Sequence, residues 1–311
     1  MSETFRPVTA ITMGDPAGIG PEIVVGTMLD KGIHECCRPF VIGSQAIMEK
    51  AAKVLGKELK YNQISDPSEA KYEYGVIDIM ETGDYDTDSI EWGKVQKLAG
   101  QMAIDWIMKS IELGMAGKID AVSTSPIHKG AIKLIGIKEP GHTEIYQHAT
   151  NSPYALTMFS CHKLRVFFVS RHMSLVDACH YATKDVILDN VINIDKELRK
   201  VGIENPLIAV AGLNPHNGDN GLFGTEEITD IGPAVEAAKE RGINCVGPCP
   251  ADSVFHIGKS GKYDAILSLY HDQGHIPLKV EGFVYNKAEG HWDAVAGVNV
   301  FLILTIGAVL S

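Results

Sequence analysis

The chain has 311 residues, with 28 lysines and arginines against 39 aspartates and glutamates, so its formal net charge is −11. Its hydrophobic content of 45% and charged content of 22% are typical of globular proteins and exclude a disordered or collagen-like chain. An acidic chain without a cluster of lysine and arginine is poorly suited to nucleic acid or to an anionic membrane surface. We therefore expect no nucleic-acid and no membrane partner.

Short apolar runs alternate with longer stretches of helical periodicity, which favours an α/β fold. The expected strands are residues 7–13, 40–43, 121–124, 164–169, 207–211 and 265–268. The apolar stretch 298–310 is shorter than the roughly 18 residues of a membrane span and is interrupted by Asn299 and Thr305. We expect a buried strand there.

Two helices are clear from the pattern of apolar residues. Residues 94–112 carry two apolar stripes, formed by Val95, Leu98, Met102 and Trp106 and by Ile104, Ile107, Met108 and Ile111. A helix that is apolar on two sides is expected to be buried against a domain or subunit neighbour. Residues 229–241 run from an acidic start to a basic end before Gly242, which suits the helix dipole and a glycine cap.

The six cysteines are too sparse for a disulfide framework, and the N-terminal sequence MSETFRPV lacks the basic and apolar regions of a secretory signal. We therefore expect a reducing, cytoplasmic location. Cys245 and Cys249 have a metal-like spacing, but no second cysteine pair follows to complete a tetrahedral site.

Three polar segments follow expected strands. The first, residues 12–22, contains Gly14, Gly18 and Gly20 and either holds an anion at a helix N-terminus or forms only a tight turn. Its glycine spacing fits neither the dinucleotide motif nor a P-loop, and we expect Asp15 to face a cleft. Residues 123–129 and 141–144 form the other two, where His142 and Thr143, with Lys129, offer donors and charge for a phosphate or carboxylate.

Three histidines occupy similar positions, each shortly after an expected strand: His172, His216 and His271. Because parallel strands place their carboxyl ends at one edge of a sheet, these side chains could converge although they are far apart in sequence. Three neutral imidazoles with an open position describe a catalytic site for a divalent metal. The alternative is that each histidine only hydrogen-bonds the backbone of its own loop.

Long motifs in a fixed order give a family resemblance. They are MGDPAGIGPE at 13–22, STSPIHKG at 123–130, GHTE at 141–144, GLNPHNGDNGLFGTEE at 212–227, GPCPADSVF at 247–255 and YHDQGHIPLK at 270–279. The chain resembles the 4-hydroxythreonine-4-phosphate dehydrogenase (PdxA) family. His275 and Ile276 are more similar to the branch that acts on 4-phospho-D-threonate or 4-phospho-D-erythronate than to the vitamin B6 branch.

The resemblance implies a two-domain α/β fold like that of isocitrate and isopropylmalate dehydrogenases, with the active site in the interdomain cleft. The first domain would comprise residues 1–125 and 276–311, and the second, with most metal ligands, residues 126–275. The implied enzyme is a homodimer with NAD and one divalent metal ion, of the zinc, cobalt or magnesium class. It would oxidise a secondary alcohol on a phosphorylated C4 hydroxy acid, with decarboxylation; 4-phosphohydroxy-L-threonine is a further candidate substrate.

By motif position, the resemblance makes His172, His216 and His271 the metal ligands. It makes His142, Thr143, Lys279 and Asn299 the substrate contacts, with His142 and Lys279 as cationic anchors for the anionic substrate. Asp252 and Asp272 adjoin these motifs and are expected to orient the ligand histidines. No general base and no nucleotide-binding residue is assigned.

The end of the chain departs from the family pattern. After Val300 a family member would read T-L-G-L-P-x-I-R, then an S-x-D-H-G-T segment and a terminal helix, but this chain reads FLILTIGAVLS, with Ala308 where arginine is expected. The resemblance implies that the missing segment normally helps to hold the nucleotide, so we expect the chain to bind NAD weakly or not at all. One alternative is therefore a C-terminally truncated, catalytically impaired member that at most binds metal and a phosphorylated ligand. Another is a three-histidine metallohydrolase.

Overall fold

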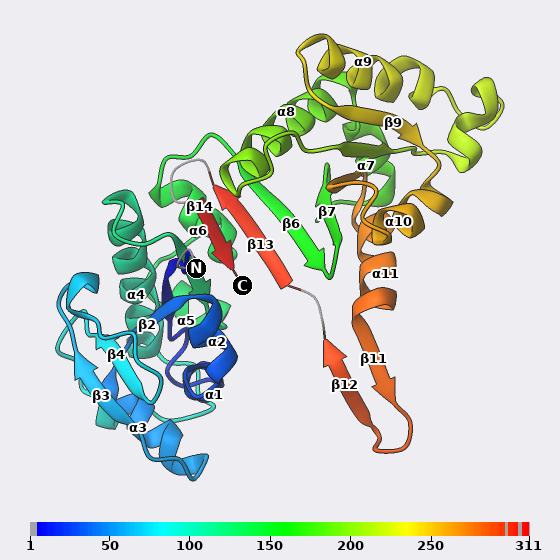
Figure 1. Ribbon diagram of the computed structural model, residues 1–311. Helices are drawn as coiled ribbons and strands as arrows, with labels where there is room; N and C mark the ends of the chain where they lie inside the picture. Colours follow the sequence, from blue (N-terminus) through cyan, green and yellow to red (C-terminus); the bar gives the residue numbers. More distant parts are fainter. Residues whose placement is uncertain (1–4, 296–297, 304–306, 311) are drawn as a thin grey trace. The chain divides into compact units, whose positions relative to one another are not determined.

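The computed structural model describes residues 5–295, 298–303 and 307–310. The chain divides into two compact units, the first within residues 1–155 and 303–311 and the second within residues 156–302. Each unit has a β-sheet with helices packed on it (Figure 1), which agrees with the expected α/β class.

The first unit contains a parallel sheet of six strands in the order β3-β4-β2-β1-β5-β14. Its strands are β1 (Val8–Thr12), β2 (Arg38–Ile42), β3 (Lys60–Gln63), β4 (Val76–Met80), β5 (Ala121–Thr124) and β14 (Gly307–Leu310). Its helices are α1 (Gly20–Met28), α2 (Lys31–Cys36), α3 (Gln45–Val54), α4 (Lys97–Met115), α5 (Lys129–Lys133) and α6 (His142–Ala149), with short 3-10 turns η1 (Pro67–Glu69) and η2 (Thr87–Ser89). The central strands are buried, as expected for apolar runs in a parallel sheet.

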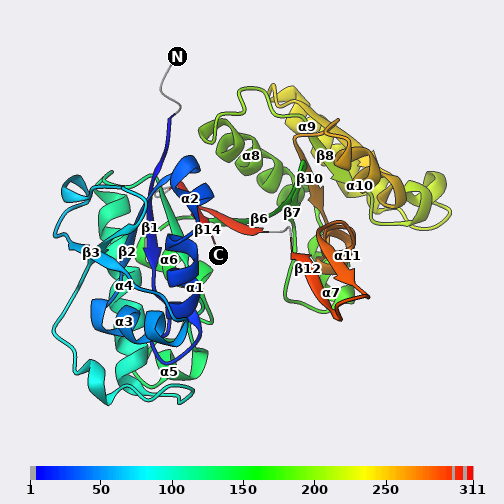
Figure 2. The same ribbon diagram turned by 60° about the horizontal axis from the view of Figure 1, so that its bottom comes forward.

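The second unit contains sheet strands in the order β13-β6-β7-β10-β8-β9, in which β7, β10, β8 and β9 are parallel and β6 is antiparallel to β7. Its strands are β6 (Ala155–Cys161), β7 (Leu164–Phe168), β8 (Ile208–Ala211), β9 (Cys245–Cys249), β10 (Ala265–Ser268) and β13 (Val298–Ile303), with a separate hairpin of β11 (Phe283–Asn286) and β12 (His291–Val295). Its helices are α7 (Leu175–Tyr181), α8 (Lys184–Lys200), α9 (Gly232–Glu240), α10 (Ala251–Lys259) and α11 (His271–Gly282), with the 3-10 segment η3 (Pro215–Gly221) and the π-helical turn η4 (Glu227–Ile231). Figure 2 shows α8 and α9 side by side.

The unit boundaries fall later in the chain than the expected 125 and 275, for reasons of packing. Helices α5 and α6 pack on α4 of the first unit, where the Ser110 and Tyr146 hydroxyls are 2.6 Å apart. A Cβ on Gly100 would lie 2.4 Å from the carbonyl oxygen of Ala131, so α4 and α5 are in close contact. At the other boundary, Leu278 of α11 is fully buried in the core cluster of the second unit.

Most expected strands are confirmed to within two residues at each end, and the long helix is confirmed as α4 (Lys97–Met115). Its two apolar sides are explained within its own unit, because α4 packs on β1 and β2 and also on α5 and α6. Trp106 and Ile107 are fully buried, whereas Met108 of the second stripe is 45% exposed.

Of two further expectations about local structure, the first is confirmed with an irregular first turn and the second is wrong. The helix expected at 229–241 begins instead as the π-helical turn η4, and its regular α-helix starts only at Gly232; the expected cap is confirmed, because Gly242 has φ +78°. The single strand expected at 298–310 is two strands, β13 and β14, and residues 304–306 between them lie outside the described part of the chain.

The loop after β1 is a tight structural turn that packs on the segment after β5. Gly14 has φ +76°, and the amide of Asp15 donates to the carbonyl of Pro126 at 2.9 Å. Asp15 is buried, and its Oδ1 accepts the amide of Ala17 at 2.8 Å, so it does not face a cleft as expected. The segment thus forms the tight turn of the second interpretation, and anion binding by it stays a prediction.

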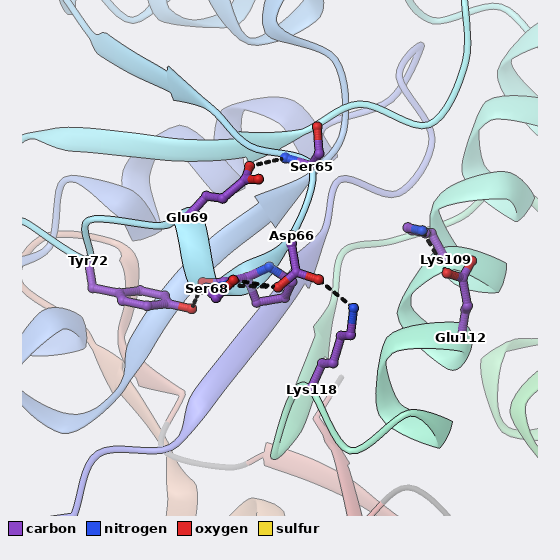
Figure 3. A network of polar contacts seen from close by, with 9 residues as sticks. Ser65, Asp66, Ser68, Glu69, Tyr72, Lys109, Glu112 and Lys118 are labelled. Atoms are coloured by element: carbon purple, nitrogen blue, oxygen red, sulfur yellow. Dashed lines mark hydrogen bonds and ion pairs between the residues drawn. The ribbon is translucent and has the colours of Figure 1, made fainter.

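A polar network joins the β3–β4 connection to the segment before β5 (Figure 3). Asp66 accepts the amide of Ser68 at 3.0 Å and pairs with Lys118. The hydrogen bonds from Lys118 and Ser68 lower the pKa of Asp66 to about 2. Glu69 accepts the amide of Ser65 at 2.7 Å, and the Tyr72 hydroxyl donates to Pro67 O at 2.7 Å.

Within the described residues, no helix combines the length and the apolar character that a membrane crossing requires. The six cysteines are all free thiols.

We expect Gly14→Ala to lower the unfolding free energy by about 2–4 kcal/mol, because alanine is strained at this positive φ and its Cβ would lie 2.4 Å from the carbonyl oxygen of Pro126. Gly26→Ala in α1 is the control, since no atom lies within 4 Å of a Cβ there and alanine should stabilise the helix by about 0.5–1 kcal/mol. Urea unfolding measures both changes. Equal effects of the two variants would contradict this account of the loop.

Candidate active site

The three predicted ligand histidines follow three neighbouring parallel strands of the second unit. His172 follows β7, His271 opens α11 directly behind β10, and His216 lies in η3 behind β8. Since β10 pairs with both β7 and β8, the three strands end at one edge of the sheet. The strand placement inferred from sequence is therefore confirmed.

Two of these histidines lie close together. The ring centroids of His172 and His271 are 6.3 Å apart. His271 donates from Nδ1 to the carboxylate of Asp272 at 2.6 Å, which leaves Nε2 of the neutral ring as the acceptor. The expected contact of Asp272 with His271 is thus present. Asp252 lies in α10 and lines a surface groove to which Tyr270 and Asp272 also contribute.

Ring stacking also holds the imidazole of His271 in place. The ring stacks on His275 with centroids 4.1 Å apart, and His275 in turn stacks on Phe168 at 4.3 Å. His275 Nδ1 donates to the carbonyl of His271 at 3.0 Å. This stack joins α11 to the last residue of β7.

His172 and His271 line a cavity of about 330 Å³, together with Ser170, Arg171, Tyr270 and Asp272 and three apolar residues. His216 is not among the lining residues. Within the described part of the chain, no three histidine, cysteine, aspartate or glutamate side chains are arranged to hold a metal ion. The donor types and strand placement are those expected of a divalent-metal site, and two of the three imidazoles, His172 and His271, lie close together, so a metal here stays a prediction.

The loop that carries His216 is held by two buried side chains from other elements. Glu227 Oε1 accepts the amides of Leu213 and Asn214, each at 2.7 Å. Gln273 Nε2 donates to the carbonyl of Gly212 at 2.8 Å, and its Oε1 accepts the amide of Leu269. The backbone of 212–214 is therefore fixed on both sides.

The substrate contacts inferred from the family resemblance fall in different parts of the structure. His142 and Thr143 open α6 in the first unit, and Thr143 is buried. Lys279 is exposed in the last turn of α11. Asn299 lies in β13, but its side chain is outside the described part of the chain.

His142 is not a cation in the folded chain at neutral pH, contrary to expectation. Desolvation by burial lowers its pKa to about 4, and its Nε2 is buried without a hydrogen-bond partner. A neutral ring remains able to donate or accept one hydrogen bond to a ligand, but it supplies no charge. Sequence reasoning gave no role to Arg171 and Tyr270, which line the cavity. Tyr270 opens the motif at 270–279, whereas Arg171 lies in none of the quoted motifs.

Comparison with known proteins supports the resemblance. The family described as "Pyridoxal phosphate biosynthetic protein PdxA" matches residues 35–306. The chain belongs to the PdxA family. Relatives provisionally named D-threonate 4-phosphate dehydrogenase are 45% identical over 278 residues in Halalkalibacterium halodurans and 46% in Symbiobacterium thermophilum; each alignment covers 89% of this chain and 83% of the relative.

Solved structures of PdxA-family proteins are also similar. A 4-hydroxythreonine-4-phosphate dehydrogenase from Burkholderia phymatum has a TM-score of 0.89 at 38% identity, over 99% of this chain and 90% of that one. Its counterpart from Klebsiella pneumoniae has a TM-score of 0.88 at 34% identity, over 100% and 91%. A terephthalate 1,2-cis-dihydrodioldehydrogenase from Burkholderia xenovorans, at 22% identity and a TM-score of 0.68 over 98% and 88%, shares the fold. The family match, the D-threonate 4-phosphate dehydrogenase relatives and the Burkholderia phymatum structure support an oxidoreductase of the PdxA family.

We expect Glu227→Ala to lower the unfolding free energy by about 2–4 kcal/mol and to speed hydrogen exchange in residues 212–217. The substitution leaves the buried amides of Leu213 and Asn214 without their acceptor. Glu226→Ala is the control. Glu226 is half-buried, and among its described contacts with residues 212–217 it accepts a hydrogen bond only from the Asn214 side chain. Exchange in residues 212–217 that is the same in both variants would argue against this role.

We expect the unfolding free energy to decline between pH 6.5 and pH 4 partly through His142. In this interval the unfolded chain binds a proton at position 142 that the folded chain, with its pKa of about 4, does not. The loss approaches about 3 kcal/mol at the acid end. His142→Asn removes this contribution, whereas His256→Asn on the exposed face of α10 keeps it. Denaturant titrations at several pH values test this, and equal slopes for wild type and His142→Asn would contradict it.

Proposed function

We propose that this PdxA-family chain is an NAD-dependent and divalent-metal-dependent dehydrogenase of a phosphorylated C4 hydroxy acid, with loss of CO₂ after oxidation. The candidate substrates are 4-phospho-D-threonate, 4-phospho-D-erythronate and 4-phosphohydroxy-L-threonine. The relatives' name, D-threonate 4-phosphate dehydrogenase, favours the first. The structural observation that carries the proposal is the pair His172–His271 in one polar cavity, 6.3 Å between ring centroids.

The cavity residues have different roles in the proposed reaction. His172 and His271 would hold the metal through their ring nitrogens, and Asp272 orients His271 by its 2.6 Å hydrogen bond. His216 is proposed as the third ligand. When bound, the metal and NAD would supply charge for the developing alkoxide and an acceptor for the hydride.

His142, Thr143, Lys279 and Asn299 remain predicted substrate contacts, His142 as a neutral hydrogen-bonding group. A substrate shared between the two units and a homodimeric assembly also remain predictions from the resemblance. Multi-angle light scattering of the purified chain measures the assembly directly.

The decisive experiment follows substrate-dependent formation of NADH with 4-phospho-D-threonate, before and after treatment with a chelator. We expect turnover that is lost with the metal and restored by Zn²⁺, Co²⁺ or Mg²⁺. Binding of metal and substrate without NADH would favour the impaired family member. Release of phosphate without any nicotinamide would favour the metallohydrolase.

For metal binding we expect His172→Ala and His271→Ala to lose stoichiometric metal, and Asp272→Ala to bind it about 10–100-fold more weakly. His148→Ala is the matched control, because this histidine is 80% exposed in the first unit and pairs with Glu139. Elemental analysis after dialysis and Co²⁺ titration provide the measurements. Full metal content in the double variant of His172 and His271 would refute the assignment.

A further inference from the structure

Two cysteines of the first unit are adjacent in the chain and do not line the cavity of His172 and His271. Cys36 ends α2 and Cys37 follows it, whereas the other four cysteines stand singly in the sequence. Both are free thiols; Cys36 is exposed and Cys37 is half-buried. A reagent in solution can therefore reach Cys36 first and then react with Cys37 beside it.

The end of α2 directs the two thiols toward the same point. Neighbouring side chains on a continuous helix do not face each other. The helix ends at Cys36, however, and Cys37 has extended backbone angles, with φ −142° and ψ 176°. As a result, Sγ of Cys36 and Sγ of Cys37 each donate to the carbonyl of Ile33 at 3.3 Å. This shared acceptor brings the two sulfurs together before any ligand binds.

The backbone that carries the pair is fixed by the fold. The amide of Cys37 also donates to the carbonyl of Ile33, at 3.0 Å. Asp30 caps the start of α2 by accepting the amide of Gly32 at 2.8 Å, and strand β2 begins at Arg38, directly after the pair. A ligand that joins the two sulfurs therefore orders little additional backbone, which favours its affinity.

The thiol of Cys37 carries its proton at neutral pH. Burial raises its pKa, a hydrogen bond with Thr9 opposes this, the charge and hydrogen bonding of Cys36 add to it, and the Arg6 guanidinium opposes it; the pKa that results is raised. A ligand that only replaces the proton would have to release it into solution. A ligand that brings an oxygen of its own removes the proton as water and is the better match.

The number of sulfurs limits the class of ligand. Within the described residues, no third cysteine, histidine, aspartate or glutamate joins the pair in a metal site. His34 of α2 is already engaged, because its Nε2 lies 3.1 Å from the carbonyl of Met28 and its ring packs edge-on against Tyr74. Tetrahedral zinc would therefore lack half of its protein ligands. A trivalent arsenical with one organic substituent needs two sulfurs only, and thiolate sulfur is a soft ligand of the kind that such a centre prefers.

We propose that Cys36 and Cys37 form a two-sulfur chelation site for trivalent arsenicals of the type R–As=O, a function beyond the proposed dehydrogenase. Two As–S bonds form, while the As=O bond and both S–H bonds break. The two thiol protons leave with the oxide oxygen as one water molecule. Arsenic stays trivalent, so the step needs no oxidant and no reductant. The alternative is that each thiol only bonds the carbonyl of Ile33 at the end of the helix.

The test titrates the reduced full-length chain with phenylarsine oxide, follows the adduct by intact mass spectrometry and counts reactive thiols with an aromatic disulfide reagent. We expect one arsenical per chain and the loss of two reactive thiols. Cys36→Ser and Cys37→Ser should each weaken binding about 10²–10⁴-fold, because a single thiol lacks the second, intramolecular bond. Cys179→Ser is the control, since it removes a half-buried single cysteine of α7, and it should leave the affinity unchanged.

Competition and peptide mapping complete the test. A dithiol should remove the arsenical from wild type, whereas an equal excess of a monothiol should not, and the mapped adduct should lie on the peptide that contains both cysteines. Removal by the monothiol, consumption of one thiol per arsenical, or an adduct at another cysteine would overturn the proposal.

None of these measurements depends on turnover, so they test the thiol pair independently of the dehydrogenase. Because Cys36 is exposed, Cys36→Ser alone decides the question if Cys37→Ser does not fold. An affinity of Cys36→Ser equal to that of wild type and of Cys179→Ser would refute the chelation site.

Discussion

The candidate site depends on hydrogen bonds that join the ends of three parallel strands. The hydroxyl of Ser170, after β7, donates to the carbonyl of Leu269, after β10, at 2.8 Å. The amide of Leu269 donates to Gln273 at 2.7 Å, and Gln273 donates to the carbonyl of Gly212, after β8, at 2.8 Å. These bonds are buried and need no ligand, so the segments that carry His172, His271 and His216 are linked by the protein alone.

Close packing of α11 is the second constraint on the site. Gly274 lies so near β7 and β10 that a Cβ there would be 2.5 Å from the ring of Phe168 and 2.7 Å from the hydroxyl of Ser268. This proximity allows His275 to stack between Phe168 and His271. The orientation of the His271 ring is therefore a result of packing in the helix behind it as well as of its bond to Asp272.

Sequence patterns predicted the α/β class, most strands and the placement of His172, His216 and His271 behind strands, because buried parallel strands are continuous apolar runs. They did not predict the π-helical turn at Glu227. The Glu227 carboxylate accepts the amides of Leu213 and Asn214, fourteen and thirteen positions earlier in the chain, and no local pattern indicates such a contact. They predicted a positive charge on His142, because the residues next to it in sequence do not reveal that its ring is buried. Nor did any motif identify Arg171, which acquires its place from strand pairing and from a cavity.

The loop behind β8 has six consecutive residues with positive φ, His216 to Gly221, at values between 42° and 94°. Only glycine, asparagine and aspartate adopt such angles at low cost, and every member of this run except His216 is one of them. Few substitutions in this loop are therefore compatible with its backbone, so we expect its sequence to vary little during evolution.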